Sequence, residues 1–216
     1  MMKASLWMVI ACAAAFAAPQ AGTERMKLGK VLVFQTADPA VVPGAGSYRF
    51  QSDRGGRKGQ SAVVTPLDAP AKGAIGTEYH LLAADTVGPL PDVDVLGIHY
   101  QKVRPERHDA FESFVAKTLH PAVANLRPDL RLLYYKAVRG PEAGTYILLF
   151  ALTRESRDKY WPGGADSDAL RAAFKPVQPL ADQLLPYLVE GSALTDPKFA
   201  ARVFESREWT DWVLTK

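Results

Sequence analysis

The chain has 216 residues, of which 48% are hydrophobic and 23% are charged, an ordinary composition for a globular protein with a packed core. The formal net charge of +3 is small and the basic residues are mixed with acidic ones, which argues against a nucleic-acid partner. The single cysteine, Cys12, lies in an N-terminal apolar run, so we expect a mature protein without disulfides, cysteine-ligated zinc or a thiolate nucleophile.

Residues 1–18 are typical of a secretory signal peptide. Lys3 gives a positive start, and the apolar run from Ala4 to Ala18 is shorter than the roughly 20 residues of a membrane-spanning helix. Ala15-Phe16-Ala17 offers a cleavage site. We therefore predict a periplasmic or secreted protein that has no membrane contact after cleavage. A lipoprotein signal with lipidation at Cys12 is the minor alternative.

Residues 19–92 contain short strand-like pieces separated by turns rich in glycine and proline. The pieces are 31–36, 47–51, 61–65 and 77–82. No helical periodicity appears, and few apolar residues are available to cover two faces of a sheet. We therefore predict an irregular extension with short strands, partly ordered on a main domain that begins after the Gly88–Asp92 linker.

Residues 93–216 have the periodicity of a βαββαβ unit. The expected strands are 94–103, 130–138, 145–152 and roughly 202–214, and helical segments follow Pro105 and Arg154. Pro121 predicts a kink near His120, and prolines later in the chain divide the second helical region. The order predicts the α+β class, with a ferredoxin-like fold: a four-stranded antiparallel sheet with two helical regions on one face.

The strand Thr145–Leu152 is the most continuously apolar of this unit. Such a strand is usually covered on both faces. The helices of the unit can cover one face only. We therefore expect a second copy of the sheet on the other face, which gives a homodimer through the sheet faces.

The βαββαβ unit with an apolar outward face resembles the dimeric α/β-barrel superfamily, which includes antibiotic-biosynthesis monooxygenases, EthD-type proteins and NIPSNAP proteins. The run Phe111–Val123, which closes on His120-Pro121, is similar to the EthD-type pattern of an aromatic helix ending in His and Pro. The resemblance implies two sheets paired face to face and a cleft between sheet and helices in each subunit. Polyketide-cyclase relatives carry a second histidine after the third strand. The stretch Arg154–Leu170 has none, which argues against a cyclase mechanism.

His99 is the first candidate catalytic residue. It shares a strand face with Gly97, whose missing side chain leaves room beside it, and an imidazole can accept or donate a proton near neutral pH. Tyr134 and Tyr135 lie on opposite faces of the next strand, so one of them reaches any cavity that the sheet lines. We assign Tyr135 to assist His99 and Tyr134 to bind ligand. The alternative for all three is a structural role in the core.

Glu205, Arg207 and Trp209 share one face of the last strand, where they can clamp an aromatic or carboxylate ligand. The alternative is a salt-bridged edge strand. His120 is a further ligand-binding candidate, although its position before Pro121 also suits a local structural role.

No histidines stand at a spacing typical of a metal site, and we expect neither a metal nor a cofactor. The sequence thus predicts an exported barrel protein that binds a small aromatic or polyketide-like ligand, with cofactor-independent monooxygenase or isomerase chemistry. A non-catalytic exported binding or assembly protein of the same fold is the alternative.

Overall fold

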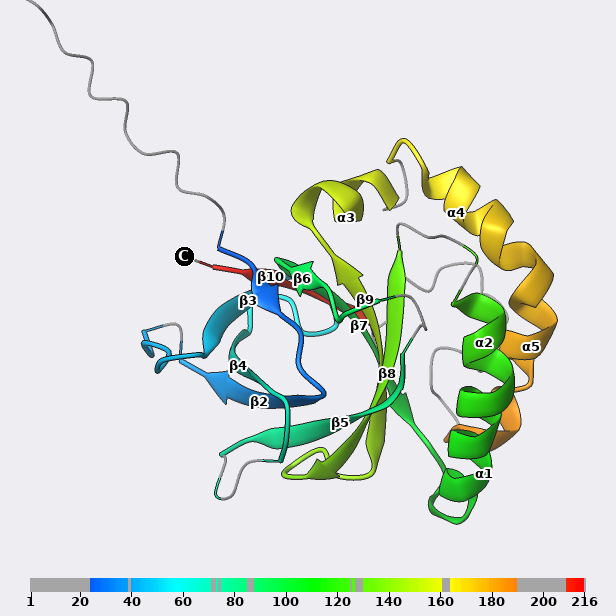
Figure 1. Ribbon diagram of the computed structural model, residues 1–216, viewed down its shortest axis with the longest axis horizontal. Coiled ribbons are helices and arrows are strands. Elements are labelled where there is room, and N and C mark those ends of the chain that lie inside the picture. Colours follow the sequence, from blue (N-terminus) through cyan, green and yellow to red (C-terminus); the bar gives the residue numbers. More distant parts are fainter. Residues whose placement is uncertain are drawn as a thin grey trace, which may run out of the picture.

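A closed β-barrel is the centre of the molecule (Figure 1). The computed structural model describes residues 24–38, 40–70, 73, 75–84, 88–124, 126, 130–160, 164–189 and 209–215. Within these residues, the strands of the barrel follow one another in the order β10-β3-β4-β2-β5-β8-β9-β7. Closure leaves no free edge in this sheet.

Each half of the chain supplies one side of the barrel. The N-terminal half contributes β2 (Val31–Ala37), β3 (Tyr48–Gly55), β4 (Ser61–Leu67) and β5 (Thr77–Ala84). The C-terminal half contributes β7 (Val95–Lys102), β8 (Arg131–Arg139), β9 (Thr145–Leu152) and β10 (Trp209–Leu214). A separate two-stranded ribbon pairs β1 (Met26–Lys27) with β6 (Asp92–Val93).

Two antiparallel seams join the halves, β3 with β10 and β5 with β8. The predicted four-stranded sheet is therefore only half of the barrel's sheet. The strand-like pieces before residue 85 are strands, but the prediction of an irregular extension is wrong for them. Few apolar residues suffice there, because each of these strands has to cover only the barrel interior and gains its backbone hydrogen bonds from neighbours on both sides.

The barrel interior is filled with apolar side chains from both halves. The N-terminal half contributes Leu32, Phe50, Val64 and Tyr79, and the C-terminal half contributes Leu96, Ile98, Leu133, Tyr135, Ile147, Leu149 and Trp212. The apolar face that predicted a second copy of the chain is thus covered by strands of the same chain. The homodimer is no longer required by this face and stays a prediction.

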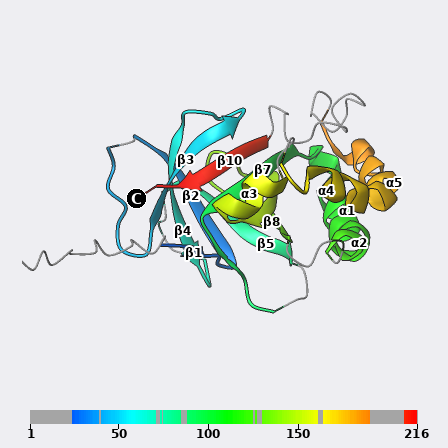
Figure 2. The ribbon, with the colours of Figure 1, turned by 90° about the horizontal axis from the view of Figure 1, so that it is seen from above.

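The helices of the described residues cover the outer face of the C-terminal half (Figures 1 and 2). They are α1 (His108–Phe114), α2 (His120–Val123), α3 (Arg154–Tyr160), α4 (Ser167–Phe174) and α5 (Gln178–Asp182). A π-helical turn, Val115–Leu119, joins α1 to α2, and 3-10 turns occupy Pro105–Arg107, Lys175–Val177 and Leu185–Tyr187. No helix among the described residues has the length and apolar character needed to cross a membrane.

Prolines account for the short helical segments. Pro121 is the second residue of α2, which starts at His120 directly after the π-helical turn. The predicted fresh helical start is thus present, although His120 itself keeps helical dihedral angles. Proline cannot donate a backbone hydrogen bond to the preceding turn. Pro105 is the first residue of a 3-10 turn, and Pro176 and Pro186 are the second residues of theirs, positions where the missing donor costs little.

Candidate functional site

The face of β7 and β10 that points to the helices carries the polar side chains of the candidate site. In the antiparallel pairing of these strands, Trp209 lies opposite His99 and Asp211 lies opposite Gly97. Directly opposite residues of such a pair point to the same face of the sheet. His99, Trp209 and Asp211 therefore share the helix-facing side.

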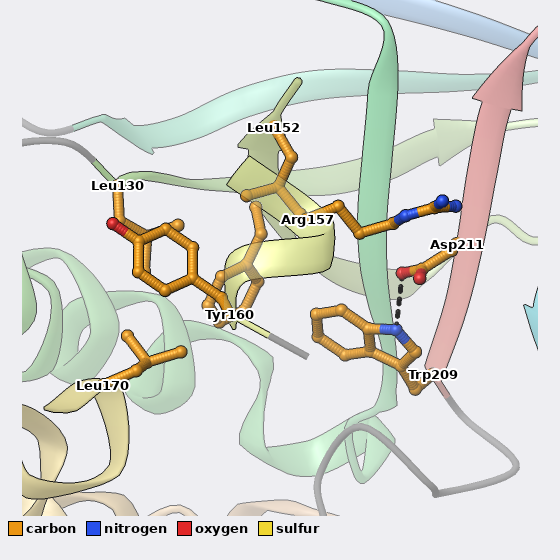
Figure 3. A pocket seen from close by; sticks show the side chains of 8 residues that line it. Leu130, Leu152, Arg157, Tyr160, Leu170, Trp209 and Asp211 are labelled. Carbon is orange, nitrogen blue, oxygen red and sulfur yellow. Dashed lines mark hydrogen bonds between the residues drawn. The ribbon is translucent and has the colours of Figure 1, made fainter. Parts of the chain in front are cut away.

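A small pocket lies between this face and the helices α3 and α4 (Figure 3). Its walls are mostly apolar, and Arg157 and Asp211 are its charged members. The lining residues are Leu130, Phe150, Leu152, Arg157, Tyr160, Leu170, Trp209 and Asp211. The cavity is about 10 Å³, the room of roughly one water molecule.

Asp211 is a fully buried acid at the edge of this pocket. The indole Nε1–H of Trp209 donates a hydrogen bond of 2.7 Å to its Oδ1, and its Oδ2 has no hydrogen-bond partner among the described residues (Figure 3). Burial raises the pKa of Asp211 to about 6, although the Trp209 hydrogen bond and the charge of Arg157 act to lower this pKa. The carboxyl group therefore changes its charge close to neutral pH.

Gly97 makes the room that the Trp209 indole occupies. A Cβ atom on Gly97 would lie 2.8 Å from Cζ2 of Trp209, well inside van der Waals contact. The ring of Phe150 also packs edge-on against Trp209, with 5.1 Å between ring centroids. The space that the sequence placed beside His99 is thus filled by tryptophan.

Arg157 of α3 connects the site to the N-terminal half of the chain. Its side chain is 11% exposed, and its Nη1 donates a 2.7 Å hydrogen bond to Oδ2 of Asp53 on β3. Its Nε donates a 3.0 Å hydrogen bond to Oδ1 of Asp158. The guanidinium is held between acids near Asp211 (Figure 3) and ties α3 to the barrel.

His99 lines neither the pocket beside Asp211 nor the pocket lined by Tyr100 and Trp212. It is 2% exposed, and the Nε2 of Gln101 lies 3.4 Å from its Nδ1. Burial lowers the pKa of His99 to about 4, so the ring is neutral at physiological pH. These surroundings suit the structural reading of His99.

Tyr135 lies on the other side of the sheet from His99, in the barrel interior. Its hydroxyl donates a 3.0 Å hydrogen bond to the carbonyl oxygen of Gly29. The assignment of Tyr135 as an assistant to His99 is therefore wrong, because the sheet separates the two side chains.

Tyr134 and His120 lie together on the helix-facing side, with ring centroids 6.3 Å apart. The His120 Nε2 lies 3.0 Å from the carbonyl oxygen of Leu132, so this histidine fastens α2 to β8. Neither residue lines the pocket. Trp209 does line it, whereas Glu205 and Arg207 lie outside the described residues.

Asp211 and Arg157 were not among the site residues predicted from the sequence. Asp211 had a usable signal, since it stands two residues after Trp209 on the same strand face and is an acid inside the apolar run WTDWVL. Arg157 had none, because its partner on β3 is 104 residues away in the chain. Within the described residues, no group of three His, Cys, Asp or Glu side chains is arranged to hold a metal ion.

No protein-family model and no curated protein matches the chain. Solved structures that are similar to it include the following two. One, from Listeria monocytogenes 4b F2365, is an uncharacterized ferredoxin fold protein related to antibiotic biosynthesis monooxygenases. Its sequence is 17% identical, the match covers 71% of this chain and 86% of that chain, and the TM-score is 0.42. The other, a monooxygenase-like protein from Listeria innocua, has 12% identity, 86% and 94% coverage and a TM-score of 0.47. The description of the first names the antibiotic biosynthesis monooxygenases, to which the sequence analysis noted a resemblance. At these identities and TM-scores neither likeness says anything of the activity of this chain.

Proposed function

We propose that the protein binds a small aromatic ligand in the pocket between the sheet and α3–α4, and that the Asp211 carboxylate removes a proton from it. This proposal keeps the ligand class and the cofactor-independent monooxygenase or isomerase chemistry expected from the sequence. It moves the acid/base role from His99 to Asp211. Loss of a proton from an acidic C–H or O–H group leaves an electron-rich anion, a first step that suits both reactions.

The observation that carries the proposal is the state of the Asp211 carboxyl group. One oxygen is fixed by the Trp209 indole, and the other has no hydrogen-bond partner among the described residues. Asp211 is also one of the residues that line the apolar pocket. A base with a pKa of about 6 is largely ionised at neutral pH and still binds a proton well. Apolar walls keep water away from the anion that forms.

The size of the pocket sets a condition on this function. A cavity of about 10 Å³ holds no aromatic ring, whereas pockets for such ligands measure several hundred Å³. The ligand therefore has to displace Tyr160 and Leu170, the apolar side chains of α3 and α4 that line the pocket.

The same small volume favours the second candidate, a non-catalytic binding or assembly protein. In that case Trp209, Asp211 and Arg157 are a buried polar contact that fixes α3 on the sheet. The two candidates differ in whether Asp211 exchanges protons with a ligand.

Proton exchange at an aromatic ketone tests the difference. The protein is incubated in D2O with 2-tetralone, and incorporation of deuterium next to the carbonyl is followed by NMR. We expect exchange above the buffer rate that increases as the pH rises through about 6, because the base acts in its ionised form. Asp211→Asn should abolish the exchange.

Asp168→Asn is the matched control, since Asp168 is an exposed acid on α4 outside the pocket. It should exchange at the wild-type rate. Exchange at the buffer rate in the wild type, with the ketone shown to bind, would favour the non-catalytic candidate.

We further propose that the protein acts outside the cytoplasm, on the basis of residues 1–18. Mass spectrometry of the protein recovered from cell-envelope and medium fractions tests this point. A mature N-terminus shortly after Ala17 supports export, and an intact Met1 in the cytoplasmic fraction contradicts it.

A further inference from the structure

A second pocket lies on the opposite side of the sheet from Asp211, where the barrel interior reaches the surface. We call it the barrel-mouth site. Its walls include four aromatic rings and two charged groups: Phe34, Tyr79, Tyr100, Trp212, Arg57 and Glu142. The cavity is about 20 Å³. The proposed proton transfer uses none of these residues.

Two hairpins, one from each half of the barrel, bring the charges together. Arg57 lies in the turn between β3 and β4, where Gly55 and Gly59 both have a φ of 87°. This left-handed conformation is readily adopted by glycine and gives a tight turn. Glu142 lies in the turn between β8 and β9.

The Glu142 carboxylate accepts a hydrogen bond on each of its two oxygens. Arg57 Nη2 donates a 2.5 Å hydrogen bond to Oε1, and the Tyr79 hydroxyl donates a hydrogen bond to Oε2. The Arg57 guanidinium also lies over the Tyr100 ring, 3.8 Å from its centroid. A guanidinium and a phenol around one carboxylate, beside aromatic walls, is a donor set for recognising a planar acid.

The Glu142 side chain can move out of the barrel-mouth site. Its side chain is 28% exposed and stands at a hairpin turn, so rotation about its side-chain bonds takes the carboxylate into water. Arg57 and the buried Tyr79 would then present their donors to the vacated position. A cationic ligand is disfavoured there, because Arg57 keeps its charge.

We propose that the barrel-mouth site binds a small aromatic carboxylate, and that Glu142 takes the place of the ligand's carboxylate in the structure described here. The ligand's acid group replaces that of Glu142 between Arg57 and Tyr79. The cavity of about 20 Å³ holds no aromatic ring by itself, so the ligand's ring takes the space that the Glu142 side chain vacates beside the aromatic walls. Glu142 thus competes with the ligand from within the chain, and its short tether makes it a strong competitor.

Removal of the competitor tests the proposal. Benzoate binding is measured on the full chain by isothermal titration calorimetry. Binding is also followed by the NMR signal of the Trp212 indole N–H, which donates a 3.0 Å hydrogen bond to the Tyr100 hydroxyl. We expect Glu142→Ala to bind benzoate at least about tenfold more tightly than the wild type. Adding Arg57→Gln to that variant should abolish binding, and the neutral analogue benzamide should not bind.

Glu112→Ala is the control, since Glu112 is also a partly exposed carboxylate in an ion pair, with Lys136 on the helix-facing side. It should leave the affinity unchanged, as should Asp211→Asn, which separates this site from the proposed function. Equal affinity in the wild type and Glu142→Ala, equal binding of benzamide, or binding that survives Arg57→Gln would each overturn the proposal. If Glu142→Ala does not fold, Glu142→Gln removes the charge and keeps the shape; it should tighten binding in the same direction, and no tightening overturns the proposal.

Discussion

The two halves of the barrel contribute similar sets of strands but differ in what covers their outer faces. Helices cover the outer face of β7–β10, and no helix among the described residues covers β2–β5 (Figures 1 and 2). The outer face of the N-terminal half accordingly carries exposed polar residues such as Gln35 and Gln51. Asp211 lies on the helix-covered face, and its burial there raises its pKa to about 6.

The inner faces of the two halves, in contrast, have the same role in packing. Each covers the other with apolar side chains, as two subunits would in a dimer of sheets. Both halves thus supply packing, whereas the proposed proton transfer uses an acid of the C-terminal half. The following experiments can break or sharpen that distinction.

The largest effect is expected from removing the N-terminal half of the barrel. A chain of residues 93–216 exposes Leu96, Ile98 and Leu149, which are fully buried in the intact protein. We expect this piece either to unfold or to self-associate through the uncovered face. Circular dichroism and analytical ultracentrifugation distinguish these outcomes. A chain that begins at residue 24 is the control, and a folded, monomeric 93–216 piece would show that the N-terminal half is dispensable.

Asp211→Asn should change how stability depends on pH. Because the folded-state pKa of Asp211 is about 6 against an ordinary 3.8, the folded protein binds this proton more tightly. The contribution of Asp211 is therefore fully present below about pH 4 and is lost as the pH rises through 6. The stability of the wild type relative to the variant should fall by up to about 3 kcal/mol over this range.

Urea unfolding between pH 4 and pH 8 measures this difference. His99, whose pKa is lowered, has the opposite dependence, but it is present in both proteins and cancels. A difference that does not change with pH would mean that Asp211 has an ordinary pKa, and the proposed base would lose its basis.

Gly97→Ala tests the packing of the Trp209 indole beneath the helices. The added Cβ would lie 2.8 Å from the indole, so the ring has to move, at a cost of about 1–3 kcal/mol. Gly44→Ala is the control, because a Cβ there meets nothing within 4 Å. Thermal unfolding should show a lower Tm for Gly97→Ala alone, and equal Tm values would contradict the close packing.

Tyr135→Phe should have the smallest effect. It removes the hydrogen bond to Gly29 inside the barrel and costs about 1 kcal/mol of stability. Since Tyr135 lies across the sheet from the pocket, ketone exchange should continue at the wild-type rate. A loss of exchange with normal stability would restore a catalytic role for Tyr135.

Local pattern sufficed to find nearly every described strand. The predicted strands 130–138 and 145–152 match β8 and β9 closely, and the four pieces before residue 85 match β2–β5. Alternation of side chains and glycine-rich turns are properties of neighbouring residues, so they are visible in sequence. The break before Pro121 was visible for the same reason, since proline acts on its own turn.

The candidate site was only partly predictable. Trp209 was found because an aromatic residue on a strand face is a local feature, and the role of Asp211 was missed because it depends on burial under α3 and α4. The prediction for His99 failed in the opposite way. Gly97 does leave space on the strand face beside His99, but the indole of Trp209, from a strand distant in the sequence, fills that space.

By itself, the sequence determined which segments of this chain become strands and helices, where the helices break and which side chains share a face. Only the tertiary structure decided what those faces meet. The seams β3–β10 and β5–β8 and the Asp53–Arg157 contact join residues far apart in the chain, and an apolar face accepts any apolar partner. The hydrophobic effect is non-directional, so a face that needs cover does not specify whether a second molecule or the chain's own first half provides it.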